Sequence, residues 1–255
     1  MSNTVVVKLG GRAQHDASLV PALAQRWKRA PGTLCIVHGG GDEVSALQRL
    51  MGHEPRFSGG RRVTAPQDLE LLRMVLSGSA NKRLVSALVA AGVAAVGVSG
   101  EDAGFIRASL AEKGELGRVG SHCKVDARLL RLLLEDGFLP VVSPLAADAA
   151  GGSEPLNVNG DDAAAAIASA LASAELLFIS DVPAVRDGDA PVSVIDAAGA
   201  AELAASGAVQ GGMLAKLDAA CAAVRAGVCR VSIGSLALLD DSTQGTQVVP
   251  SRSAA

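Results

Sequence analysis

The chain of 255 residues contains no tyrosine and only one tryptophan. Because aromatic rings are so few, surfaces on which nucleic-acid bases stack are not expected. The formal net charge is −3 and the basic residues are scattered, so neither nucleic acid nor an anionic membrane is predicted as a partner. No apolar run approaches the ~20 residues of a membrane-spanning helix. No signal peptide is expected either, because residues 1–4 lead directly into a strand-like run.

The sequence also lacks the patterns of several common site types. Its four cysteines are far apart and form no C-x-x-C pair, which predicts free thiols in a reducing cytoplasm. The four histidines have no metal-ligand spacing, so the chain is expected to supply no metal site of its own. The nucleophile pattern G-x-S-x-G, the P-loop pattern G-x-x-x-x-G-K-[ST] and the dinucleotide pattern G-x-G-x-x-G are all absent.

Short β-branched runs alternate along the chain with segments of helical periodicity. Strands are predicted at 5–7, 34–37, 94–99, 138–143, 176–180 and 229–233. Helices are predicted at 42–51, 67–91, 126–135, 161–172, 200–205 and 212–226. The polar, glycine-rich stretch 102–124 is predicted to be a hairpin-like excursion from the alternating strands and helices.

This alternation predicts an α/β fold, an open and mostly parallel sheet sandwiched between helices. A length of 255 residues and a hydrophobic fraction of 49% allow one large core. We therefore expect a single domain spanning 1–255. Its N-terminal lobe would cover about 1–150 and its C-terminal lobe about 151–255, with the boundary in the Gly/Ser/Asp-rich stretch 146–152.

Two glycine clusters follow the first two predicted strands: Gly10-Gly11 and Gly39-Gly40-Gly41. Ligands of open α/β sheets bind at the carboxyl ends of the strands. Glycines there let backbone N–H groups approach anionic oxygens without interference from a Cβ atom. Tight strand-to-helix turns could explain one cluster, but two such clusters favour the binding of phosphate or carboxylate.

Three basic residues lie beside glycines. Lys8 ends an apolar strand, where burying a lysine is costly unless it faces a cleft that holds an anion. Lys216 stands on a helix preceded by two glycines, and a surface lysine is the alternative interpretation. Arg62 could clamp a carboxylate with its planar fork, or could be a solvated loop residue.

The segment Asn157-Val158-Asn159-Gly160-Asp161 places two amides and a carboxylate at the start of a helix. Ordinary helix capping would explain it, since Asn and Asp are common caps. Together with the glycines and the isolated cations, however, it indicates a site for a charged small molecule. The combination suggests phosphoryl transfer, a reaction that depends on positioning and charge neutralisation.

Six motifs occur in the order of a known family. They are V-V-V-K-L-G-G (5–11), V-H-G-G-G (37–41), R-V-T (62–64), N-V-N-G-D (157–161), S-D-V (180–182) and G-G-M-x-x-K (211–216). The chain thus resembles the amino acid kinase family and, within it, the acetylglutamate kinases, over 5–249. The glycine clusters and S-D-V are family-wide, whereas H-G-G-G, R-V-T and N-V-N-x-D together are more specific.

The resemblance implies ATP-dependent phosphorylation of the γ-carboxylate of N-acetyl-L-glutamate in arginine biosynthesis, with Mg²⁺ carried by the nucleotide. It implies that Lys8 and Lys216 stabilise the transferring phosphoryl group and that Asp161 holds both lysines in place. It assigns five residues to the acetylated amino acid: Gly40, Gly41, Arg62, Asn157 and Asn159. It assigns eight to the nucleotide: Gly10, Gly11, Ser180, Asp181, Val182, Ala208, Val209 and Gln210. The nucleophile has a reference pKa near ~4.3, so no general base is expected.

Two other functions remain open at this point. The run 51–57 also resembles relatives that phosphorylate aminoadipate on a carrier protein, although those relatives lack the arginine of R-V-T and do not read N-V-N. A kinase of acetylaminoadipate or of a carrier-linked amino acid is one alternative, since a single methylene is weakly discriminated. The other is a non-catalytic sensor on the same fold, which the presence of Lys8, Asp161 and Lys216 disfavours.

The resemblance also bears on assembly. Arginine-sensitive relatives carry an additional N-terminal helix that links dimers into hexamers, and residues 1–4 are too short to form one. We therefore expect a homodimer, joined through the apolar helix predicted at 67–91, with little feedback by arginine.

Overall fold

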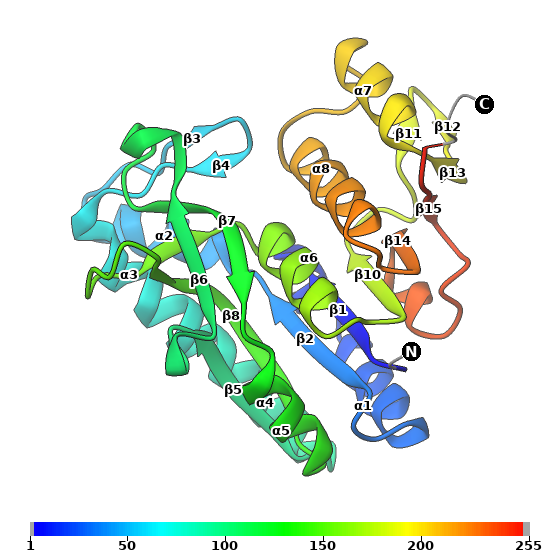
Figure 1. The fold of residues 1–255 in the computed structure, drawn as a ribbon, viewed down its shortest axis with the longest axis horizontal. Coiled ribbons are helices and arrows are strands. Elements are labelled where there is room, and N and C mark those ends of the chain that lie inside the picture. The colour runs from blue at the N-terminus through cyan, green and yellow to red at the C-terminus, as the bar shows by residue number, and fades with distance from the viewer. Residues whose placement is uncertain (1–2, 252–255) are drawn as a thin grey trace.

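The computed structural model describes residues 3–251, apart from the side chains of Arg12 and Lys113. Its centre is an eleven-stranded sheet with helices on both faces (Figure 1). In spatial order the strands are β13 (Val194–Ile195), β15 (Thr246–Val248), β14 (Arg230–Gly234), β10 (Glu175–Ile179), β1 (Val5–Leu9), β2 (Leu34–His38), β8 (Leu139–Asp148), β6 (Ile106–Leu110), β7 (Val119–Val125) and β9 (Leu156–Val158), with β5 (Ala95–Gly100) paired to β8 off this path. Neighbouring strands run parallel except in the pairs β14–β15, β6–β7 and β8–β9.

The helices form a layer on each side of this sheet. They are α1 (Leu19–Arg29), α2 (Gly41–Leu50), α3 (Leu69–Arg73), α4 (Asn81–Ala90), α5 (Arg128–Glu135), α6 (Gly160–Ala170), α7 (Ala197–Ala205) and α8 (Gly211–Arg225). Helices α6 and α8 pack together in front of the sheet in the view of Figure 1, and α1 and α4 pack together behind it. The predicted open sheet between helices is thereby confirmed.

Shorter elements connect these layers. Two separate hairpins are β3 (Phe57–Ser58) with β4 (Arg61–Arg62) and β11 (Arg186–Asp187) with β12 (Ala190–Pro191). The short helices are η1 (Arg12–His15), η2 (Pro66–Asp68), η3 (Met74–Ala80), η4 (Asp102–Gly104), η5 (Ala111–Gly114) and η6 (Leu236–Leu239).

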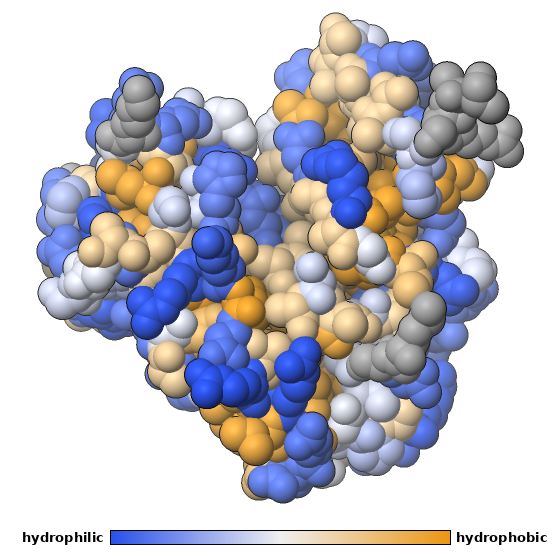
Figure 2. All heavy atoms as spheres, viewed as in Figure 1, coloured by the Kyte–Doolittle hydropathy of each residue, from blue (hydrophilic) through white to orange (hydrophobic). Residues whose placement is uncertain are grey.

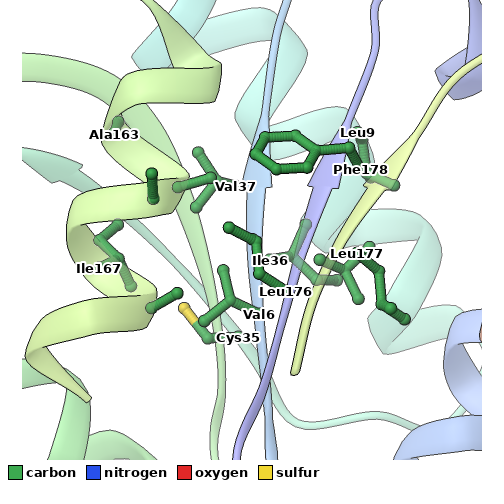
Figure 3. Packing of buried hydrophobic residues seen from close by; sticks show 14 of the residues in the cluster. Val6, Leu9, Cys35, Ile36, Val37, Ala163, Ile167, Leu176, Leu177 and Phe178 are labelled. Carbon is green, nitrogen blue, oxygen red and sulfur yellow. The ribbon is translucent and has the colours of Figure 1, made fainter. Parts of the chain in front are cut away.

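The core lies between the central strands and α6. Strands β1 and β2 are buried along their whole length, as expected for parallel strands covered on both faces. Figure 3 shows Val37 facing Ala163 and Ile167 of α6, while Phe178 of β10 lies beside Leu9. Residues 5–9, 34–38 and 175–179 therefore form one rigid platform, and their carboxyl ends meet at one edge.

Most predicted elements are present, and the structure adds short strands such as β9, β13 and β15 that were not predicted. The helix predicted at 67–91 is a continuous helical run that includes the π-helical turn η3. The strand predicted at 138–143 continues to Asp148, because Leu145 and Ala146 pair with β9. Helix α1 has no predicted counterpart, although Leu19, Leu23 and Trp27 recur every four residues and are buried. The predicted excursion at 102–124 contains the antiparallel pair β6–β7.

Candidate active site

One carboxylate oxygen binds two lysine ammonium groups at the carboxyl end of β1. The Oδ1 atom of Asp161 lies 2.8 Å from Nζ of Lys8 and 3.1 Å from Nζ of Lys216. Lys8 comes from β1, Asp161 from the first turn of α6, and Lys216 from the second turn of α8. All three are buried, with exposed fractions of 8%, 5% and 6%. The structure thus brings together the three residues predicted to be catalytic.

The close packing of these charges shifts the pKa values of Asp161 and Lys216. Burial alone would raise the pKa of Asp161, but the two ammonium groups outweigh it and hold that pKa below its ordinary value. Burial, and then the charge of Lys8, lower the pKa of Lys216 to about 8, with Asp161 opposing both. The Lys216 ammonium also lies 5.4 Å from the centre of the Phe178 ring. At neutral pH the cluster therefore carries one net positive charge and attracts an anion.

The glycine clusters lie directly beside these lysines. Strands β1 and β2 are parallel neighbours, with Leu9 opposite His38, so the two clusters follow side by side. A Cβ atom on Gly10 would lie 3.1 Å from the carbonyl oxygen of Ile179, and one on Gly40 would lie 2.8 Å from Cδ2 of Leu76. The Ile179 backbone beside Gly10 and the Leu76 side chain beside Gly40 therefore leave little room for a Cβ atom at either position.

Two cavities meet at Lys8. The inner cavity has a volume of about 210 Å³, and its wall includes the five residues predicted for the amino acid: Gly40, Gly41, Arg62, Asn157 and Asn159. The outer cavity has a volume of about 510 Å³, and its wall includes Gly10, Gly11, Ser180, Asp181, Val182 and Lys216. The described residues that line both are Lys8, Gly11 and Gly41.

Three of the predicted nucleotide residues lie elsewhere. Ala208, Val209 and Gln210 connect α7 to α8 and line neither cavity. Val209 is buried in the core, and the side chain of Gln210 donates to the carbonyl oxygen of Gly207 at 3.0 Å. The segment precedes the first turn of α8, which carries Gly212 and Met213 into the outer cavity wall.

Helix α2 holds the fork of Arg62. One guanidinium nitrogen donates to the Gln48 side chain at 2.5 Å. The other donates to the Gly41 carbonyl at 2.7 Å and to the Ser45 hydroxyl at 2.8 Å. The guanidinium also lies 4.7 Å from the centre of the Phe57 ring. Arg62 is thus a positioned cation on the wall of the inner cavity.

The two asparagines have different local roles. The Asn159 side chain caps α6, accepting from the N–H of Asp161 at 3.1 Å, so the capping interpretation of this segment is correct for this residue. The Asn157 amide instead donates to the Thr64 hydroxyl at 2.9 Å. A Cβ atom on Gly160 would lie 3.2 Å from Cε of Lys8, so this glycine leaves room for the lysine chain.

Sequence reasoning missed several residues around the site. His38 is fully buried, and burial lowers its pKa to about 4, so the ring is neutral. Its Nε2 lies 3.1 Å from the amide nitrogen of Asn81, which makes Nε2 the acceptor, and Nδ1 therefore donates to the Gly39 carbonyl at 2.8 Å. Arg61 pairs with Asp162, at 2.9 Å, beside the cluster. Adjacency is the signal for three of them, since His38 precedes the second glycine cluster and Arg61 and Asp162 adjoin Arg62 and Asp161, whereas Asn81 has no such signal.

Magnesium fits this site only as a companion of a phosphate ligand. Among residues 3–251, no three His, Cys, Asp or Glu side chains converge to hold a metal ion. The carboxylate of Asp161 already faces two ammonium groups, while Asp42 and Asp181 stand on the wall of the outer cavity. Phosphate oxygens would therefore supply most ligands of a bound Mg²⁺.

A glycine-lined cleft at a sheet edge, with a cationic cluster between two cavities, is typical of an enzyme that transfers phosphoryl groups. Residues 3–235 match the amino acid kinase family, and the chain belongs to this family. It is 41% identical to the acetylglutamate kinase of Roseiflexus sp. (strain RS-1), over 98% of this chain and 94% of that protein. It is 40% identical to the acetylglutamate kinase of Chloroflexus aurantiacus (strain ATCC 29366 / DSM 635 / J-10-fl), over 94% and 95%. The crystal structure of smu.665 from Streptococcus mutans UA159 superposes with a TM-score of 0.87 at 28% identity, over 98% and 99%.

Proposed function

We propose that this chain is an acetylglutamate kinase, which transfers the γ-phosphoryl group of ATP to the γ-carboxylate of N-acetyl-L-glutamate. The product is N-acetyl-L-glutamyl 5-phosphate, an intermediate of arginine biosynthesis. Two relatives named acetylglutamate kinase are about 40% identical to this chain, and the similarity extends over nearly their whole length. The observation that carries the proposal is the position of Lys8 at the junction of a small and a larger cavity.

The inner cavity is the proposed amino-acid site. Its volume of about 210 Å³ is below the roughly 300 Å³ at which pockets for drug-sized ligands begin, which suits a small acylated amino acid. Arg62 would hold the α-carboxylate through its planar fork. Asn157, Asn159, Gly40 and Gly41 would contribute amide and backbone contacts. The γ-carboxylate would then point to Lys8.

The outer cavity is the proposed nucleotide site. Gly10, Gly11 and Lys216 lie on its wall and would face the phosphates. Ser180, Asp181 and Val182 follow β10 on the same wall, and 208–210 would border the nucleotide more remotely. The proposed amino-acid site takes most of its wall from a lobe of about 1–150, with Asn157 and Asn159 added from the other lobe. The proposed nucleotide site takes Ser180, Asp181, Val182 and Lys216 from a lobe of about 151–255 and Gly10 and Gly11 from the first lobe. Mg²⁺ would enter with ATP.

The chemistry requires cations and no base. A carboxylate oxygen of the substrate forms a bond to the γ-phosphorus, the bond to the bridging oxygen breaks, and ADP leaves with that electron pair. Lys8 and Lys216 would neutralise the negative charge that the phosphoryl oxygens carry in the transition state. Asp161 has a lowered pKa and serves as the common counter-ion of both lysines. It therefore positions cations and takes no proton.

A direct assay tests the proposal. Purified protein is supplied with ATP, Mg²⁺ and one acidic amino acid at a time, and ADP release and hydroxylamine-trapped acyl phosphate are measured. N-acetyl-L-glutamate should give the highest kcat/KM, above N-acetyl-L-aspartate, N-acetyl-L-aminoadipate and L-glutamate. Equal or better turnover of acetylaminoadipate, or ATP binding with no turnover of any acid, would contradict the proposal.

Assembly and location are part of the same proposal. We expect a homodimer through the helical run of α3, η3 and α4, where Met74 and Val89 are 59% and 53% exposed. The four cysteines are free, which supports a reducing, cytoplasmic location. No helix among the described residues is long and apolar enough to cross a membrane. Light scattering would test the dimer.

A further inference from the structure

A third and larger hollow opens beside the active site. This alanine groove has a volume of about 920 Å³ and lies between α6 and α8 on one side and β7 on the other. Its helical wall includes Ala165, Ala166, Ala170, Ala219, Ala222 and Ala223. Figure 2 shows light-orange atoms down the middle of this face, where α6 and α8 lie in Figure 1. Such a wall is smooth and apolar.

One residue separates the groove from the inner cavity. Among the described residues, only Arg61 lines both. Its Nη2 atom donates to Oδ2 of Asp162 at 2.9 Å, so the side chain spans from the β3–β4 hairpin to the first turn of α6. Asp162 lines the groove and not the inner cavity. The ion pair therefore stands at the boundary between the two spaces.

A backbone contact reinforces the same boundary. Gly60 directly precedes Arg61, and a Cβ atom built on it would lie 2.7 Å from the carbonyl oxygen of Gly211. The tip of the hairpin thus rests against the start of α8, while Arg61 reaches α6. Because these contacts hold the hairpin at two points, the inner cavity stays small on this side.

The acyl group of the substrate would lie at this boundary. In the proposed function Arg62 binds the α-carboxylate, and the acylated nitrogen is attached to the same α-carbon. The acyl group must then lie at the Arg61–Arg62 end of the inner cavity, with the γ-carboxylate at the Lys8 end. Neighbouring side chains of a strand point to opposite sides, so Arg62 reaches α2 and Arg61 reaches α6.

We propose that the Arg61–Asp162 pair is the wall that limits the acyl group to a short chain, and that the alanine groove accepts a longer aliphatic acyl chain once this wall is removed. The inference rests on the proposed function. It makes Arg61 a specificity-determining residue. An acyl chain longer than acetyl would displace Arg61 from Asp162 and leave both charges partly unpaired in unmodified protein.

The test compares N-acetyl-, N-butyryl- and N-hexanoyl-L-glutamate as substrates of unmodified protein and of Arg61→Ala. The measured quantity is kcat/KM for the hexanoyl substrate divided by kcat/KM for the acetyl substrate. We expect this ratio to rise at least about tenfold in Arg61→Ala, since a single methylene in an apolar pocket is worth roughly that factor. Arg61→Lys keeps length and charge, so its ratio should stay close to that of the unmodified protein.

Arg56→Ala is the matched control, because Arg56 precedes the same hairpin and is exposed. It should leave the ratio unchanged. If Arg61→Ala fails to fold, Asp162→Ala removes the same pair from α6 and should raise the ratio in the same direction. A purely structural role of the pair would change kcat/KM for all three acyl lengths alike, and that result would overturn the inference. If unmodified protein does not turn over acetylglutamate, the proposed function is overturned, and the inference about the Arg61–Asp162 pair is overturned with it.

Discussion

Replacing Lys216 by methionine should make the protein more stable and nearly inactive. Methionine is unbranched and similar in length, so it can fill the space beside Phe178. The Lys8–Asp161 pair at 2.8 Å remains and is neutral as a whole. The substitution removes one of the two ammonium groups that share the Asp161 carboxylate, and with it the net positive charge of the cluster. In the proposed reaction that charge stabilises the transferring phosphoryl group.

The size of the stability change follows from the pKa of Lys216. Folding lowers this pKa from 10.5 to about 8 through burial and the charge of Lys8, against the opposing effect of Asp161, and this shift corresponds to a net penalty of roughly 3 kcal/mol for the charged form. The lost contact with the Phe178 ring returns about 1 kcal/mol of that. We therefore expect Lys216→Met to raise the free energy of unfolding at pH 7 by about 2 kcal/mol. Turnover should fall by roughly 10²–10³-fold.

The sign can be checked with pH. Between about pH 8 and 10.5, the unfolded chain still holds the Lys216 proton that the folded chain has released. Stability therefore rises with pH in this window, by linkage. The burial penalty is fully present below pH 8 and vanishes above 10.5. The stability of Lys216→Met should therefore lack this part of the rise with pH.

Urea unfolding at pH 7 and pH 9.5, with turnover at saturating substrates, measures both effects. Lys28→Met serves as a control for the loss of a lysine, since Lys28 is exposed and lines neither cavity of the site. A Lys216→Met protein that is less stable than the unmodified chain at pH 7 would refute the electrostatic reasoning. A protein that keeps near-normal turnover would refute the assigned role.

Three further substitutions test other parts of the site. Lys8→Ala should lower turnover by roughly 10²-fold or more with an unchanged circular dichroism spectrum, and normal turnover at saturating substrates would exclude Lys8 from the reaction. Arg62→Lys should raise the KM for the amino acid more than the KM for ATP, because lysine offers a point charge in place of a bidentate fork. An equal rise of both KM values in steady-state titrations would argue against two separate cavities. Asn159→Ala removes the side-chain acceptor at the start of α6 and should lower the free energy of unfolding by about 1 kcal/mol. Scanning calorimetry should then show a melting temperature lower by roughly 2–4 °C. An unchanged melting temperature would show that the cap contributes nothing to stability.

The parts of this site that follow strands could be predicted from the sequence. Lys8 and the two glycine clusters stand where buried β-branched runs end, and parallel strands bring such ends to one edge. The helix start at Asn159 was recognisable from its capping chemistry, although capping alone did not reveal a site. Lys216 was identified through its glycines and the family motif, because a lysine on a helix has no distinctive local pattern.

Contacts between distant segments could not be predicted in this way. Arg61 and Asp162 are 101 residues apart, and nothing local to either shows that they pair. The same holds for β15, which enters the sheet through pairing with β14 and β13 and has only three residues. The π-helical turn η3 packs beside Gly40 through Val75, Leu76 and Ala80, whereas helical periodicity alone predicts a uniform α-helix.

The position of β1 in the sheet has a consequence for the order in which the protein can mature during synthesis. This strand is made before the other described strands, yet it lies between β2 and β10, so one of its edges stays open until residues 175–179 have left the ribosome. Lys8 likewise has no counter-ion until Asp161 is made. A nascent chain of about 1–150 would expose an unpaired edge and a lysine in an apolar setting, both unfavourable in a compact state. The two lobes should therefore fold together, late in translation, and a separately expressed N-terminal lobe is expected to aggregate.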